Sequence, residues 1–146
     1  MIAKEYLSQA LLLDQRIHIK LEHLTSLRAL ATKMSATLRQ DKVSGGNTSR
    51  SRMENAVVKI VDLEKEINED IDHLVDLKAE IRETISQIED PIGQVVLEMR
   101  YINGKGWDDI ARGLRYNNRS VFKIHSRALR NVSEIKKRAV KFSKGQ

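Results

Sequence analysis

Apolar residues recur at alternating spacings of three and four from residue 6 to residue 38, which is the period of one helical face. The stripe runs through Tyr6, Ala10, Leu13, Ile17, Lys20, Leu24, Leu27, Ala31, Met34 and Leu38. No Gly or Pro interrupts it. At about 1.5 Å per residue, a helix of this length extends roughly 50 Å. The pattern therefore predicts one long helix.

A second stripe with the same period runs from residue 57 to residue 88 and predicts a coiled-coil seam. Its positions are Val57, Ile60, Glu64, Ile67, Ile71, Leu74, Lys78, Ile81, Ile85 and Ile88. Four further apolar residues widen it, namely Val61, Leu63, Val75 and Leu77. A wide stripe suits contact with more than one neighbouring helix. Glu64 and Lys78 would each cost stability in the seam unless paired, and polar seam residues often fix the register.

The segment from residue 41 to 52 separates the two stripes, and its Gly-Gly pair and small polar residues favour a flexible loop. The simplest arrangement over residues 1–89 is a helical hairpin, an antiparallel coiled coil. Residues 1–52 carry 9 Lys/Arg and 4 Asp/Glu, whereas residues 53–90 carry 4 and 12, so opposite charge favours this pairing. A hairpin of two helices leaves apolar surface uncovered. We therefore expect a homo-oligomer, with a dimer favoured.

Asp90-Pro91 predicts a helix start, because Asp is a good N-cap and Pro suits the first helical position. Three short helical patterns follow over residues 90–146, which we predict to be a second domain. Their apolar positions are Ile92, Val95, Val96, Met99 and Ile102, then Trp107, Ile110, Ala111 and Leu114, then Val121, Ile124, Ala128 and Val132. Residues 103–106 form a turn by composition, and Asn117 is the expected N-cap of the last helix. The predicted fold is all-α: a long N-terminal hairpin followed by a compact helix-turn-helix domain.

Residues 91–146 hold 13 Lys/Arg and 4 Asp/Glu, a density typical of nucleic-acid binding. A recognition helix reads bases near its N-terminus, so Arg119 could bind guanine and Asn118 adenine. Lys123, Arg127 and Arg130 suit phosphates, and Phe122 suits a thymine methyl group or a protein partner. The candidate DNA-binding residues are Asn118, Arg119, Phe122, Lys123, Ser126, Arg127, Arg130 and Arg115. The alternative is a three-helix bundle that merely has a basic surface.

Three segments carry a resemblance: 97–101 (Leu-Glu-Met-Arg-Tyr), 107–111 (Trp-Asp-Asp-Ile-Ala) and 118–129 (Asn-Arg-Ser-Val-Phe-Lys-Ile-His-Ser-Arg-Ala-Leu). Together they resemble region 4 of sigma-70-type factors, which implies binding of promoter DNA and contact with bacterial RNA polymerase. With its helical N-terminal half, the chain is similar to phage and prophage transcription regulators of the RinA and ArpU type. That resemblance implies activation of late or packaging genes. Asn117 and Phe122 depart from region 4, which usually has Ser or Thr and often Arg there, so a standard −35 target is not expected.

No motif for catalysis is present, and we expect neither an enzyme nor a cofactor. There is no Cys, and His18, His23, His73 and His125 are scattered, which favours surface histidines over metal ligands. No apolar run approaches the roughly 18 residues of a membrane span. The chain also lacks the aromatic-rich module with which a complete sigma factor melts promoters. We expect a cytoplasmic protein of a bacterial host cell.

The leading hypothesis is a transcription regulator that binds double-stranded DNA and activates with host RNA polymerase. A phage small terminase subunit is the first alternative, because it also joins a helix-turn-helix to a helical hairpin. In terminases the DNA-binding domain comes first, whereas here it comes last, which favours regulation. A repressor and a purely structural coiled coil are the further alternatives. A dimer would favour the regulator and a ring the terminase.

Overall fold

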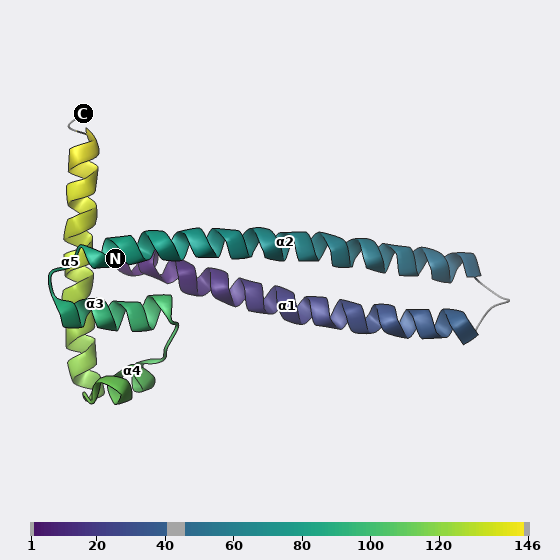
Figure 1. Cartoon of the computed structure of the whole chain (residues 1–146), viewed down its shortest axis with the longest axis horizontal. Coiled ribbons are helices and arrows are strands. Elements are labelled where there is room, and N and C mark those ends of the chain that lie inside the picture. The colour runs from purple at the N-terminus through teal and green to yellow at the C-terminus, as the bar shows by residue number, and fades with distance from the viewer. Residues whose placement is uncertain (1, 41–45, 145–146) are drawn as a thin grey trace. The chain divides into compact units, whose positions relative to one another are not determined.

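The computed structural model describes residues 2–40 and 46–144, and every regular element among them is helical (Figure 1). The elements are α1 (Ile2–Gln40), α2 (Gly46–Ser86), α3 (Pro91–Leu97), a π-helical turn (Glu98–Ile102), α4 (Trp107–Leu114) and α5 (Asn118–Lys144). The all-α fold, with a long N-terminal pair of helices packed together, is confirmed. No described helix is long and apolar enough to cross a membrane.

The helices form two compact units, one made of residues 14–73 and the other of residues 1–13 together with 74–146. In the 14–73 unit, which we call the hairpin, α1 contributes the predicted stripe, and Ile17, Leu24 and Ala31 are buried. Leu24 packs with Leu63 and Ile67 of α2. The hairpin is therefore closed by a narrow seam of side chains from its two helices.

The buried seam of α2 lies one residue away from part of the predicted stripe. Leu63 and Leu77 are buried, whereas Val57, Ile71 and Val75 are exposed. Leu63 and Leu77, expected to offer surface to another helix, thus already pack within the chain. The predicted stripe is buried at Ile67, Ile81, Ile85 and Ile88 but not at Val57 and Ile71. The difference arises because α2 has two adjoining apolar stripes, and only the contact with α1 decides which of them is covered.

Polar side chains at the hairpin seam are paired. The Lys20 ammonium donates a 2.6 Å hydrogen bond to Asp70 and lies 3.7 Å from Glu66. The bond to Asp70 holds the pKa of Lys20 above its ordinary value. Arg28 likewise donates to Glu64 at 2.7 Å, which supplies the partner that Glu64 required. Because each pair joins one position of α1 to one of α2, they select a single register.

The second unit, which we call the compact unit, has two clusters of buried side chains. One joins both ends of the sequence to the middle: Ala3, Leu7, Ala10, Leu77, Ile81, Ile85, Ile88, Leu97, Tyr101, Ala128 and Val132. The other joins the helix-turn-helix elements: Val96, Ile110, Ala111, Val121 and Ile124, with Trp107 and Leu114 against them. The boundary predicted at residue 90 lies inside this unit, where the turn before Pro91 connects α2 to α3.

Local geometry differs from the predictions at three points. The predicted loop over residues 41–52 is shorter, because α2 begins at Gly46, whereas residues 41–45 lie outside the described part. Asp90 occupies the N-cap position of α3 but makes no side-chain cap hydrogen bond. After Leu97 the π-helical turn widens the helix. Tyr101, within this turn, and Leu97, just before it, are buried although the predicted stripe omitted them, whereas Val95 of α3 is exposed.

Candidate nucleic-acid interface

The start of α5 is fixed by a tight connection from α4. Arg115 adopts the left-handed conformation (φ 59°), and its amide and that of Tyr116 bond back to carbonyls of α4. The Asn117 side chain then accepts a 2.8 Å hydrogen bond from the Ser120 amide, as expected of an N-cap. The turn between α4 and α5 thus spans three residues, 115–117, as predicted.

One face of α5 is buried and the opposite face is exposed. Val121, Ile124, Ala128 and Val132 are buried, as predicted. On the other side, residues spaced by three and four along the helix are exposed, and we call them the reading face: Arg119, Phe122, Lys123, Ser126 and Arg130. Because the buried face holds α5 against the compact unit, the reading face points to solvent as a rigid surface. Five of the eight sequence-predicted site residues therefore lie together.

The other three predicted residues lie beside this face. Asn118 donates to the Asp108 carboxylate at 2.9 Å, and Arg127 lies 3.5 Å from the Asp90 carboxylate. Arg115 is exposed in the turn before α5. All three can still meet a ligand, but Asn118 and Arg127 would exchange an internal partner for it.

Aromatic packing anchors the reading face. Phe122 is 45% exposed and meets Trp107 edge to face, with ring centroids 5.3 Å apart. The Arg100 guanidinium covers the Trp107 ring at 4.7 Å. Phe122 therefore combines a fixed position with an open apolar surface. Arg100 was not predicted, because its role depends on the packing of the π-helical turn against α4.

The expectation of a surface histidine is wrong for His125, which is buried, whereas His18, His23 and His73 are exposed. Its Nε2 is 2.7 Å from the Tyr101 hydroxyl, and its ring packs on Trp107. Burial lowers the pKa of His125 to about 4, with the positive charges of Lys4 and Arg100 acting in the same direction. A neutral His125 therefore belongs to the support beneath the reading face. Its position four residues after Val121, on the buried stripe, was the available signal.

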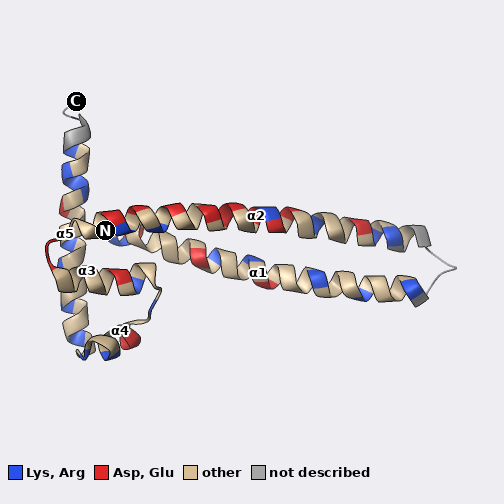
Figure 2. Ribbon diagram, in the orientation of Figure 1, with Lys and Arg blue, Asp and Glu red and all other residues tan. Residues whose placement is uncertain are grey.

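Charge is distributed unevenly along the chain (Figure 2). Asp and Glu are concentrated on α2, whereas Lys and Arg recur along α5. The net charge of residues 91–146 is +9, from 13 basic and 4 acidic residues. No described group of three or more His, Cys, Asp or Glu side chains could hold a metal ion. The reading face itself thus carries three cations, Arg119, Lys123 and Arg130, beside the Phe122 ring.

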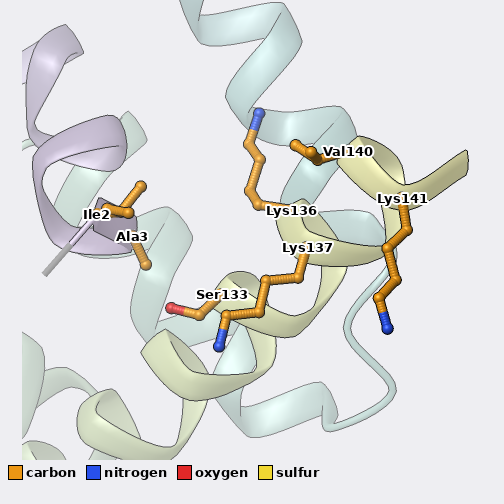
Figure 3. Close-up of a pocket in the computed structure, with 7 residues that line it drawn as sticks. All are labelled: Ile2, Ala3, Ser133, Lys136, Lys137, Val140 and Lys141. Atoms are coloured by element: carbon orange, nitrogen blue, oxygen red, sulfur yellow. The ribbon is translucent and has the colours of Figure 1, made fainter. Parts of the chain in front are cut away.

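Beyond Val132, α5 lines an open cavity of about 590 Å³ together with the start of α1 (Figure 3). Ile2 and Val140 supply exposed apolar surface there, beside Lys136, Lys137 and Lys141. Lys136 lies 3.7 Å from the centre of the Tyr6 ring. This contact directs one basic side chain of the α5 end towards α1.

Residues 32–133 match the family described as "Protein of unknown function (DUF1492)". No curated protein and no solved structure matches the chain. The matched range extends from the second half of α1 into α5 and includes the whole reading face.

Proposed function

The chain belongs to the DUF1492 family, whose description assigns no activity, and we propose from its geometry that it binds double-stranded DNA through α5. The observation that carries this proposal is the reading face, a rigid and exposed set of side chains opposite a fully packed one. A major groove admits one α-helix, and Arg is the commonest partner of guanine there. α4, the three-residue turn and α5 have the arrangement of a helix-turn-helix.

Within this face we assign two roles. Arg119 stands in the first turn of α5, where recognition helices contact base edges, and with Phe122 it would read sequence. Arg130 stands three turns later and would neutralise a phosphate, which adds affinity for any DNA. Lys123 and Ser126 lie between them, and Asn118, Arg115 and Arg127 would contact the flanking backbone or bases.

Two substitutions test this division. Arg119→Ala should weaken binding to the selected site by ~1–3 kcal/mol and relax its sequence preference. Arg130→Ala should weaken cognate and random DNA alike and reduce the slope of log K against log salt by about one. Fluorescence anisotropy on a site selected from a random library measures both. Arg16→Ala, an exposed change in the hairpin, is the control. Equal effects of the two α5 variants on cognate and random DNA would refute the assignment.

We further propose that this DNA binding regulates phage genes by activating the polymerase of a bacterial host. The support is the resemblance of residues 97–129 to sigma region 4, a module that contacts both promoter DNA and polymerase. It would act with a holoenzyme that carries its own sigma factor, which would supply the melting of the promoter. Transcription reconstituted on a bound promoter tests the proposal. A transcript yield that only falls as the site fills would identify a repressor, and a ring-shaped assembly would favour the small terminase.

A further inference from the structure

The hairpin has two lateral edges, which are the two sides of the helix pair that flank its buried seam. The edges differ in their side chains, and a contact between opposite charges lies on each side. The Arg28–Glu64 pair lies on one edge, and the contact between Lys20 and Glu66 lies towards the other. Residues seven apart on paired helices occupy the same edge, as do residues three or four apart. Leu21 precedes Arg28 by seven, and Val57 and Ile71 flank Glu64 by seven. We call this surface the neutral edge, and its residues are Leu21, Arg28, Val57, Val61, Glu64 and Ile71.

The neutral edge exposes apolar side chains around a single compensated charge pair. Val57 is 45% exposed, Val61 56%, and Ile71 and Leu21 40% each. Between Val57 and Ile71 its charges are those of Arg28 and Glu64, whose side chains meet at 2.7 Å. Asp14 and Glu54, which the same spacing places on this edge, lie towards its two ends.

The threonine hydroxyls beside Arg28 do not depend on water as a hydrogen-bond partner. Thr25 and Thr32 lie three residues before and four after it, and therefore on the same edge. Their hydroxyls donate to carbonyls of α1 at 3.1 and 2.9 Å. Since each hydroxyl already has a partner within the helix, a protein surface could cover these threonines without leaving a donor unsatisfied.

The opposite edge is unsuited to burial. Ile19 and Leu30 are exposed there, on the side of α1 that faces away from Arg28. On α2, however, the same edge carries Asp62, Glu66 and Glu69, all exposed. A partner covering this edge would have to remove several carboxylates from water, which is costly unless each one is paired. The neutral edge is therefore the side of the hairpin that a partner can cover.

We propose that the occupant of the neutral edge is the same edge of a second copy of this chain, related by a two-fold axis near the Arg28–Glu64 pair. Two-fold symmetry requires a self-complementary surface, because each residue i that contacts j has its counterpart in j contacting i. The neutral edge meets this condition. Its apolar residues can pack on their equivalents, and one central cation and one central anion can each face the opposite charge of the second copy. The result is four helices around a shared apolar core.

This inference goes beyond the proposed DNA binding and does not depend on it. It concerns only the hairpin, whereas the DNA contacts are assigned to α5. If both hold, the dimer would present two recognition helices to two half-sites. A failure of dimerisation would leave the Arg119 and Arg130 test unaffected, and the two proposals are therefore separable.

A matched pair of exposed substitutions tests the assignment. Val61→Lys adds a charge to the neutral edge, and Ile19→Lys adds the same charge to the opposite edge, where the native side chain is 65% exposed. Both residues are on helix surfaces, and circular dichroism checks that the helices remain. In sedimentation equilibrium, the full-length wild type and Ile19→Lys should dimerise alike, whereas Val61→Lys should raise the dissociation constant at least tenfold. A monomeric wild type at high micromolar concentration, or equal effects of the two changes, would overturn the proposal.

Charge exchange tests the position of the axis. Arg28→Glu and Glu64→Arg each place like charges at the centre of the interface, and each should weaken the dimer. The double variant Arg28→Glu/Glu64→Arg restores opposite charges and should return the dissociation constant to within a few-fold of the wild type. A double variant that dimerises as poorly as either single variant would show that this pair does not lie at a two-fold axis.

Discussion

The hairpin and the compact unit bury their apolar side chains to different depths. In the hairpin the best-covered residues, Ile67 and Ile17, keep 4% and 5% of their surface. In the compact unit Leu7, Ile81 and Ile85 keep none. Two helices can cover a side chain only from one direction, whereas α1, α2, α3 and α5 enclose it from several. The comparison implies that the stability of the chain is concentrated where the candidate DNA-binding helix is anchored.

Truncating one buried side chain in each unit is the strongest test of this difference in burial. Ile85→Ala should lower the free energy of unfolding by ~2–5 kcal/mol, because the cavity it leaves is closed on all sides. Leu63→Ala, at a site that remains 7% exposed, should cost an amount at or below the low end of that range. Urea denaturation followed by circular dichroism measures both. The comparison applies at concentrations where the chain is monomeric. Equal costs there would mean that the hairpin seam is covered as completely as the core of the compact unit.

The pH dependence of stability should also differ between histidines of the two units. The pKa of His125 is about 4 when folded, against about 6.5 unfolded, so its contribution is fully present above pH 6.5. As the pH falls from 6.5 towards 4, the unfolded chain takes up the proton and about 3 kcal/mol of stability is lost. The variant His125→Gln should lose this part of the pH dependence. His23→Gln, which alters an exposed histidine of the hairpin, should keep it.

The hydrogen bond beneath the reading face should contribute less. Tyr101→Phe removes the hydroxyl 2.7 Å from the His125 Nε2 and leaves a buried nitrogen without a partner, which should cost ~1–3 kcal/mol. Tyr116→Phe is the matched control, because Tyr116 is 45% exposed and water replaces its partner. Urea unfolding of the two variants gives the difference. If neither substitution lowers the free energy of unfolding, the His125 imidazole finds another partner, and its hydrogen bond with Tyr101 does not stabilise the packing beneath α5.

The smallest expected difference lies between two helix starts. Asn117 caps α5 through its side chain, whereas Asp90 occupies the same position in α3 without such a bond. Asn117→Ala should therefore cost about 1 kcal/mol. Asp90→Ala removes only the partly exposed ion pair with Arg127, worth ~0.2–1 kcal/mol. Thermal melting should place Asn117→Ala about 2–4 °C below wild type, and Asp90→Ala closer to it. If Asp90→Ala instead lowered the melting temperature more than Asn117→Ala, the Asp90–Arg127 ion pair would contribute more stability than a partly exposed pair is expected to.

The sequence predicted helix type and order because each stripe has one clear period, and it predicted α5 in detail. Val121, Ile124, Ala128 and Val132 are all buried as expected. It was wrong for part of α2. Val57 and Leu63 lie on adjoining apolar stripes, and only packing against α1 decides which of the two is buried. It also failed at Tyr101, because no local pattern reports the extra residue of a π-helical turn.

The candidate site was predictable to the extent that it follows from α5 alone. The reading face is the complement of the buried stripe, so its members could be named from spacing. The partners of Asn118 and Arg127 could not, since Asp108 and Asp90 come from other helices. The contact of Arg100 with Trp107 also joins two different helical elements, so it could not be predicted either. Sequence periodicity assigns a face to each residue of one helix, but contacts between helices depend on their packing.

The contact of Ala3 and Leu7 with the cluster that contains Ala128 and Val132 has a consequence for biosynthesis. These residues come from opposite ends of the sequence, so the loop they close is nearly as long as the chain, and such contacts slow folding. On the ribosome, α1 emerges before α5, and the side chains of its first turns have no α5 to pack on until that helix has also emerged. The candidate DNA-binding helix would thus acquire its full support only after translation of residue 132. Apolar surface exposed during that interval would be open to chaperones or to premature association.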